Sequence, residues 1–241
     1  MPVSDRQELI EGWEQEKLTK ASVFVAGAGG LGGEIAEGLV RQGIGELHIA
    51  DDDKVTATNL NRQKFTHENL WKNKAIELCK NLSKVGPMDS VLIAHPCIAQ
   101  KVNLDSIRID VIVCGIDNRV PGTRLWLCKY GLERTMPVVF IALSEDADWG
   151  YLFVQEVEKA CWSCALKPEL VVQSSEEDTC PRVPASCDLQ RVACGFAIRA
   201  IDTLLMPKMK RDWNFRTFSM SRGEFGGARM VQKRAGCNVC S

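Results

Sequence analysis

The stretch 22-SVFVAGAGGLG-32 decides the fold of this chain. It opens with a mostly apolar run, 22–26, which is typical of a buried strand. Glycines follow, and then residues 31–42, where apolar side chains recur at the spacing of one helix face. A buried strand, a glycine-rich turn and a helix in direct succession are typical of a nucleotide-binding unit in an open α/β sheet.

The turn matches the pattern G-x-G-x-x-G, and its glycines have separate physical uses. Gly27 permits a tight turn, Gly29 lets a phosphate approach the backbone, and Gly32 lets the helix pack closely on the strand. Free N–H groups at the helix N-terminus attract phosphate. Asp51 ends the next predicted strand, where an acid can bind ribose hydroxyls. These features predict a nucleotide site but do not identify the nucleotide; the alternative is a purely structural turn.

The rest of the first 145 residues alternates predicted strands and helices. Further strands are expected at 46–50, 90–94, 110–114 and 137–141, and further helices at 73–83 and 120–131. This alternation predicts a Rossmann-like, doubly wound, mostly parallel α/β sheet.

The second part of the chain has a different pattern. Strands are expected at 150–157, 213–220 and 227–232, a helix at 189–205, and a loop over the polar, proline-flanked residues 168–184. No clean linker separates the two parts. We therefore expect a single domain over 1–241, in which C-terminal antiparallel strands extend the sheet.

Composition narrows the function. The chain has 241 residues, 45% hydrophobic and 25% charged, with a net charge of −1. This balance is typical of a globular protein and gives no overall basic field for nucleic acid or membrane lipid. Residues 1–20 lack the apolar core of a secretory signal, and no run is long enough to span a membrane. We expect a cytoplasmic protein with no nucleic-acid or membrane partner.

Four of the eleven cysteines form two C-x-x-C pairs, Cys161 with Cys164 and Cys237 with Cys240. Without a signal peptide, cysteines are more often metal ligands or free thiols than disulfides. Four thiolates in paired spacing suit tetrahedral zinc. The alternative is two redox or disulfide pairs.

The segments after the second and fourth predicted strands carry more polar residues than a dinucleotide site requires, which is one acid after the second strand. These polar residues are Asp51, Asp53, Asn59, Arg62, Gln63, Lys74, Asp117 and Asn118. In an open parallel sheet these positions can converge at the carboxyl ends of the strands. Cations beside one or two acids suit a triphosphate, and an acid can hold Mg²⁺.

The whole pattern resembles the ThiF/MoeB/HesA branch of the ubiquitin-activating-enzyme-like superfamily. The resemblance covers nearly the whole chain. It rests on Arg6-Gln7, Gly12-Trp13, the turn GAGGLG, 51-DDDKVTATNLNRQ-63, Lys74, Ile116-Asp117-Asn118 and the two cysteine pairs.

The resemblance implies ATP-dependent adenylation of the C-terminal glycine carboxylate of a small ubiquitin-like carrier of the ThiS/MoaD type, ending in Gly-Gly. The adenylate would activate the carrier for sulfur transfer or conjugation. The cofactors implied are ATP, Mg²⁺ and a structural Zn²⁺ on the four paired cysteines. A homodimer is also expected. Because the sequence shows no rhodanese domain, the sulfur donor is expected to be a separate protein.

The resemblance also implies roles for individual residues. Gly29 and its neighbours Gly27, Gly30 and Gly32 would contact phosphates, and Asp51 would bind ribose, with Asp53 bracing the loop or acting directly. Asn59, Arg62, Gln63 and Lys74 would line the triphosphate. Asp117 with Asn118 would serve Mg²⁺ and the reacting centre, and Arg6 would reach across the homodimer. The implied parts are an N-terminal helical arm, 1–20, a nucleotide-binding half, 21–145, and a zinc-bearing, partner-binding half, 146–241.

The remaining cysteines divide into two groups. Cys180 occupies the place where sulfur-carrier-activating enzymes can bond covalently to the carrier, although nearby Asp178 would raise the thiol pKa and so gives no sign of activation. Cys187 or Cys194 could substitute for it. The others lie in apolar contexts and are expected to be core thiols: Cys79, Cys97, Cys114 and Cys128.

Some positions depart from the family pattern. Val3 replaces the first arginine of R-x-x-R-Q, Trp71 replaces a glycine before the helix that carries Lys74, and the segment after Cys180 is changed. The last change puts the identity of the carrier in doubt. Two other functions stay open: an NAD(P)-binding oxidoreductase, which gives no reason for Arg62, Lys74 and Asp117 together, and a non-catalytic scaffold.

Overall fold

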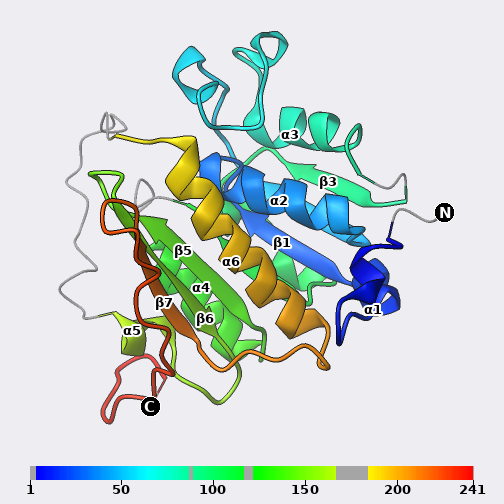
Figure 1. The fold of residues 1–241 in the computed structure, drawn as a ribbon. Helices are drawn as coiled ribbons and strands as arrows, with labels where there is room; N and C mark the ends of the chain where they lie inside the picture. Colours follow the sequence, from blue (N-terminus) through cyan, green and yellow to red (C-terminus); the bar gives the residue numbers. More distant parts are fainter. Residues whose placement is uncertain (1–3, 87–88, 117–121, 167–183, 241) are drawn as a thin grey trace.

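A computed structural model describes residues 4–86, 89–116, 122–166 and 184–240 (Figure 1). Its centre is a seven-stranded sheet in the order β3-β2-β1-β4-β5-β6-β7. The strands are β1 Ser22–Ala26, β2 Glu46–Ala50, β3 Val91–His95, β4 Val111–Cys114, β5 Val138–Leu143, β6 Trp149–Gln155 and β7 Phe215–Ser219. The pairs among β1 to β5 are parallel, and β6 pairs antiparallel with β5 and β7. The predicted doubly wound sheet with an antiparallel extension is confirmed.

Helices cover both faces of this sheet. They are α1 Gln15–Lys20, α2 Gly30–Gln42, α3 Lys74–Leu82, α4 Thr123–Glu133, α5 Trp162–Ala165 and α6 Cys187–Leu205. One core cluster joins the sheet to α2, α3 and α6, and a second joins its other face to α4 and α5. In Figure 1, α2 and α6 lie side by side across the sheet, with α4 behind it.

The connection from β3 to β4 has no α-helix. It uses two short 3₁₀ turns, η4 Ala99–Lys101 and η5 Leu104–Ser106. Further 3₁₀ turns are η1 Gln7–Leu9, η2 Ala57–Asn59 and η3 His67–Asn69. Because β1 and β4 are neighbours whose crossovers run to opposite sides, the switch point of the sheet lies between them, where such folds bind ligands.

The N-terminal arm is attached through amide groups. Gln7 and Gln15 both donate to the carbonyl of Gln42, at the end of α2, over 2.8 and 2.9 Å. The indole of Trp13 donates to Gln15 over 2.8 Å. These bonds satisfy a carbonyl that the last turn of a helix leaves unpaired.

One predicted strand is wrong. Within the described part of the chain, residues 227–232 form no strand but a single bridge between Arg229 and Phe215. The side chain of Asn214 takes over the next pairing, bonding both the N–H and the carbonyl of Val231 at 2.6 and 3.0 Å. Side-chain amides compete with backbone ladders in this way.

No helix among the described residues is long and apolar enough to cross a membrane.

Candidate functional site

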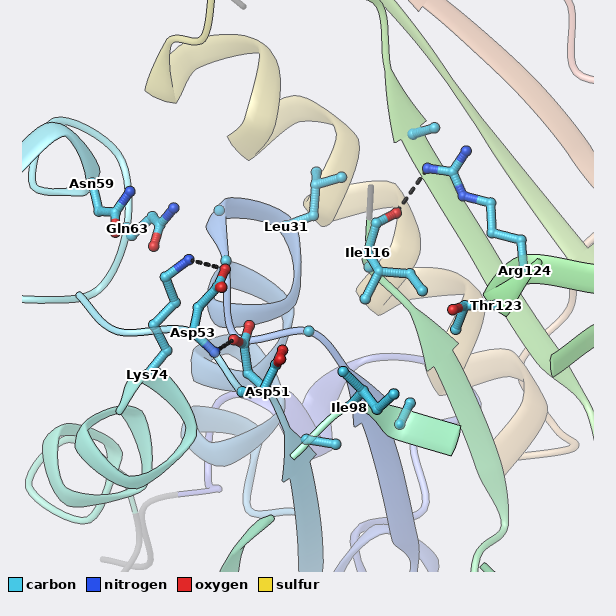
Figure 2. Close-up of a pocket in the computed structure, with 18 of the residues that line it drawn as sticks. Leu31, Asp51, Asp53, Asn59, Gln63, Lys74, Ile98, Ile116, Thr123 and Arg124 are labelled. Carbon is cyan, nitrogen blue, oxygen red and sulfur yellow. Dashed lines mark hydrogen bonds and ion pairs between the residues drawn. The ribbon is translucent and has the colours of Figure 1, made fainter. Parts of the chain in front are cut away.

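A cavity of about 300 Å³ opens at the carboxyl ends of the parallel strands (Figure 2). Nine of the residues predicted from the sequence line it together: Gly27, Gly29, Gly30, Asp51, Asp53, Asn59, Arg62, Gln63 and Lys74. Residues separated by almost fifty positions thus meet at the switch point of the sheet, as the spacing predicts.

The glycine turn has the shape that a phosphate site requires. Gly27 has φ +99°, a conformation that favours glycine. A Cβ on Gly32 would lie 1.8 Å from the carbonyl oxygen of Gly27, so the helix can approach the strand only with glycine there. A Cβ on Gly29 would have no neighbour nearer than 4.0 Å, so this backbone is open to the cavity. Helix α2 begins here, at Gly30, and the first N–H groups of a helix are free to bind an anion.

Asp51 joins the turn to the second strand. Its carboxylate accepts from the N–H groups of Ala28 and Asp53 over 2.7 and 2.8 Å. Burial raises the pKa of Asp51 above its ordinary value, and the charge of Lys74 opposes that rise. Each oxygen keeps a second lone pair, so the carboxylate can still accept from a ribose hydroxyl.

Lys74 is the cation nearest to the acids. Its side chain is 10% exposed and its ammonium lies 2.9 Å from Asp53. Two further contacts fix its place, since its N–H donates to the carbonyl of Asp53 and Asn73 caps the helix by accepting from Ile76. The Lys74 ammonium is therefore held beside Asp53 in the cavity wall and does not extend into solvent.

The loop after β2 presents amides and a guanidinium to the cavity. Asn59 accepts from the N–H of Thr56 and closes a capping box that stiffens the loop. The guanidinium of Arg62 donates to the carbonyl of Thr58 and to Asn61. Gln63 carries a buried side-chain oxygen without a hydrogen-bond partner among the described residues.

Several cavity residues were missed by sequence reasoning. Ile98, Ala99 and Gln100 of the η4 region line the cavity, as do Thr123 and Arg124 at the start of α4. Arg124 donates to the carbonyl of Ile116 over 2.7 Å. Only the position of Arg124 shortly after the fourth strand could have suggested it; the η4 residues carry no local motif.

A second missed residue lies on α6. Gln190 is buried, donates to the carbonyl of Arg62 over 3.0 Å, and lies so close to Gly30 that a Cβ there would be 2.2 Å from its oxygen. It joins the glycine turn to the arginine loop. Its partners are more than a hundred positions away, so sequence spacing could not reveal it.

Three predicted site residues, Asp117, Asn118 and Cys180, lie outside the described residues. Arg6 is described, and it is exposed beside η1 and absent from the cavity lining. Its predicted role concerns the ATP site of a second subunit.

Trp71, where the family pattern has a glycine, adopts a left-handed backbone conformation. It has φ +66°, a region that glycine occupies without strain, and its side chain is 70% exposed. The backbone turn just before α3 is therefore the one that a glycine would favour.

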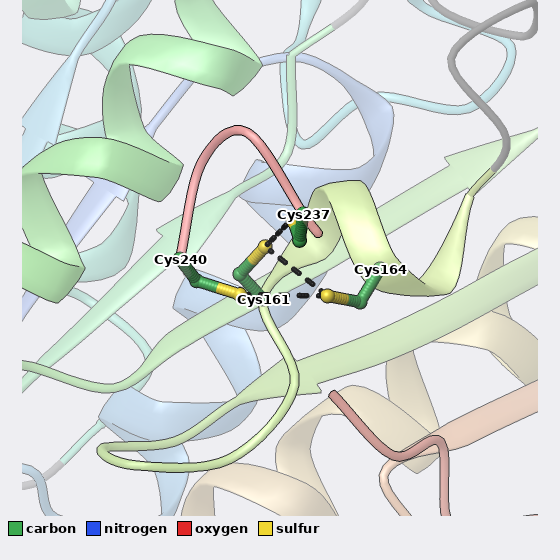
Figure 3. A group of neighbouring side chains, drawn as sticks. All are labelled: Cys161, Cys164, Cys237 and Cys240. Atoms are coloured by element: carbon green, nitrogen blue, oxygen red, sulfur yellow. Dashed lines mark hydrogen bonds between the residues drawn. The ribbon is translucent and has the colours of Figure 1, made fainter. Parts of the chain in front are cut away.

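The four paired cysteines form one cluster (Figure 3). The sulfur of Cys161 lies 3.7 Å from those of Cys164 and Cys237, and Cys164 lies 3.5 Å from Cys240. Four sulfurs about 2.3 Å from one tetrahedral zinc ion would be roughly 3.8 Å apart. The donor set and its spacing therefore fit zinc.

The other thiols are mostly unsuited to covalent chemistry. Burial raises the pKa of Cys79 and of Cys114 to about 11. Cys194 is fully buried, and burial raises its pKa well above the ordinary value, so the expectation that it could substitute for Cys180 is wrong. Cys187 is partly exposed at the start of α6.

Comparison with known proteins places this geometry in a family. Ubiquitin-like modifier-activating enzyme 5 of Aedes aegypti is 29% identical over 181 residues, 70% of this chain and 45% of that protein. Adenylyltransferase and sulfurtransferase MOCS3 of Xenopus laevis is 29% identical over 240 residues, 94% of this chain and 50% of that protein. The chain thus spans about half the length of these curated relatives.

Solved structures share the fold. A crystal structure of E. coli MccB with ATP matches with a TM-score of 0.76 at 19% identity, covering 94% of this chain and 68% of that one. The model of the ThiF family matches residues 5–239, nearly the whole sequence. This chain belongs to the ThiF family.

Proposed function

We propose that this protein uses ATP to adenylate the C-terminal glycine carboxylate of a small ubiquitin-like carrier protein. The observation that carries the proposal is the buried Lys74 ammonium, paired with Asp53 in the wall of the glycine-turn cavity. A dinucleotide site needs the turn and one acid, whereas a triphosphate also needs cations to neutralise its phosphates. The names of two relatives, a modifier-activating enzyme and an adenylyltransferase, agree with this reading.

The reaction needs little from the protein beyond placement and charge. The glycine carboxylate is ionised at neutral pH, so it can attack the α-phosphate without a general base, and pyrophosphate leaves. The N–H groups of the glycine turn, Arg62 and Lys74 would stabilise negative charge on the phosphates. Asp51 would orient the ribose.

Two metals accompany the proposal. Mg²⁺ would neutralise the triphosphate, held by the carboxylate of Asp117 and by the phosphates themselves. Zn²⁺ on the four cysteines would be structural, because four sulfur ligands leave no position for water.

The partners follow the family pattern. We propose a carrier of the ThiS/MoaD type, a homodimer in which Arg6 reaches the partner's ATP, and a separate sulfur donor. Cys180 is the candidate for a covalent link to the carrier. Residues 21–145 would bind the nucleotide, and residues 146–241 would bind the zinc and the carrier.

The test is incubation with MgATP and a panel of small ubiquitin-like proteins ending in Gly-Gly. Pyrophosphate release and a carrier heavier by one adenylate are expected, and a carrier without its last glycine should give neither. ADP and inorganic phosphate as the only products would contradict adenylation. Equal pyrophosphate release with the intact carrier and with the carrier that lacks its last glycine would also contradict it.

A further inference from the structure

Helix α4 lies between the cavity and the cysteine cluster. Its first residues, Thr123 and Arg124, line the cavity. Cys128, just over one turn later, is fully buried in the core cluster that also contains Cys161 and Cys237, and α4 packs against α5, the helix that carries Cys164. One short helix therefore touches both sites, and Cys128 is a fifth thiol outside the group of four.

Gln155, at the end of β6, makes three hydrogen bonds at this junction. It is 1% exposed. Its side-chain oxygen accepts from the Cys128 thiol over 3.1 Å and from the N–H of Trp162 over 3.0 Å. Its amide nitrogen donates to the carbonyl of Cys128 over 2.9 Å. The side-chain amide of Gln155 therefore links α4 to the start of α5.

The bond to Trp162 matters because of where α5 begins. Cys161 is its N-cap residue, no side chain caps the helix, and Cys164 lies within its four residues. A helix this short has no stability of its own. Its orientation, and with it the direction of both cysteines, depends on outside partners, which include the buried side chains of Gln155 and Tyr151.

Close packing makes the junction rigid. A Cβ on Gly131 would lie 2.5 Å from Val138 and 3.2 Å from the nitrogen of Gln155, so α4 rests directly on β5 and on this amide. The indole of Trp162 in turn stacks on Phe140 of β5, with ring centroids 5.7 Å apart.

We propose that Gln155, with Cys128, is the positioning pair that holds the Cys161–Cys164 knuckle in metal-binding geometry and ties metal occupancy to the order of α4. The inference rests on the zinc assignment above but not on adenylation. Hydrogen-bond partners behind metal ligands orient them, and their loss weakens metal binding by about 10–100-fold.

Metal affinity is the first readout. The zinc dissociation constant of the full chain is measured by competition with a chromophoric chelator for wild type, Gln155→Leu, Cys128→Ala and Cys128→Ser. Both Gln155→Leu and Cys128→Ala should bind zinc about tenfold more weakly or worse, while Cys128→Ser, which keeps a donor, should lose less. Cys79→Ala is the matched control, because it removes a partly buried thiol on α3, and it should bind like wild type.

Two more measurements separate positioning from general damage. Cobalt-substituted variants should keep the charge-transfer spectrum of four thiolates, since no ligand is removed. Hydrogen exchange should show the amides of 123–133 losing protection when zinc is stripped from wild type, and already unprotected, with no further change, in Gln155→Leu.

Three results would overturn the proposal. The first is wild-type zinc affinity in both Gln155→Leu and Cys128→Ala. The second is amide hydrogen exchange in α4 of the wild type that does not change when zinc is removed, and the third is a wild type that binds no zinc. If Gln155→Leu does not fold, the comparison of Cys128→Ala with Cys79→Ala decides alone. Adenylation is not a readout here, so its failure would leave this result intact.

Discussion

At the scale of single residues, Lys74 separates what the sequence can predict from what it cannot. Its spacing from the glycine turn is visible in the sequence, and a lysine on a helix is usually a solvated one. Its burial depends on Asp53, 21 positions earlier, and on the cap at Asn73. The role of this lysine thus depends on a tertiary contact that no local pattern contains.

The substitution Lys74→Met should abolish function without unfolding the chain. The substitution removes the buried ammonium that is paired with Asp53 and that would face the phosphates. MgATP binding should therefore weaken. The adenylation rate should fall at least about 100-fold, the usual cost of losing one transition-state donor. Lys80→Met on the same helix removes a largely exposed lysine paired with Glu77. Equal adenylation rates in the two variants would refute the assignment.

Trp71 gives a test of backbone strain. Because φ is +66° and the side chain is 70% exposed, little packing is lost on substitution and the backbone decides the result. Trp71→Gly should be more stable than Trp71→Ala by about 1 kcal/mol, the cost of a Cβ in the left-handed region. Urea unfolding of the two variants measures the difference; an Ala variant as stable as the Gly variant would mean that the turn relaxes.

At the scale of elements, the packing of α6 on α2 contains a buried acid. Burial raises the pKa of Asp202 to about 6 from an ordinary 3.8, although Gln42 and Arg199 oppose the rise. One of its oxygens has no hydrogen-bond partner among the described residues. The folded state thus prefers the protonated acid, so the stabilising contribution is complete below pH 3.8 and is lost as the pH rises through about 6.

Asp202→Asn should therefore stabilise the protein at pH 8 and by only about half as much at pH 5. The upper bound at pH 8 is about 3 kcal/mol, since one pKa unit corresponds to ~1.4 kcal/mol. Urea unfolding at both pH values gives the comparison. A gain that is the same at pH 5 and pH 8 would show that Asp202 does not titrate in this range.

Two helical glycines should respond in opposite directions to the same change. On α4, a Cβ at Gly131 would meet Val138 at 2.5 Å and a carbonyl oxygen at 2.9 Å. On α6, a Cβ at Gly195 would meet nothing within 4 Å. Gly131→Ala should destabilise by about 1–3 kcal/mol through overpacking, whereas Gly195→Ala should stabilise by about 0.5–1 kcal/mol through helix propensity. Thermal unfolding measures both, and the same sign for both would contradict the close approach of α4.

At the scale of the whole molecule, the sequence predicts most of the architecture. Apolar runs and glycine signals locate the seven strands of the sheet to within two residues, because burial and turn formation are local properties of the pattern. Residues 227–232 were misassigned because the side chain of Asn214 replaces the ladder there. Gln155 and Gln190 were missed because a buried amide is recognised by its partners, and these partners lie far away in the chain.

The residues of the candidate site were likewise only partly predictable from the sequence. The motif residues meet in one cavity because parallel strands bring their carboxyl ends to one edge, which spacing can predict. The η4 residues enter the cavity because the β3–β4 connection lacks an α-helix, a property of the fold and not of any motif.

The most direct test of the central claim is calorimetric titration of the full chain with MgATP and, separately, with NAD. We predict saturable binding of MgATP at one site per chain and no binding of NAD, because the cavity joins a glycine turn to the cations Lys74 and Arg62. Binding of NAD without MgATP would contradict the account: the glycine turn would be correctly assigned, and the triphosphate site built on those two cations would be wrong.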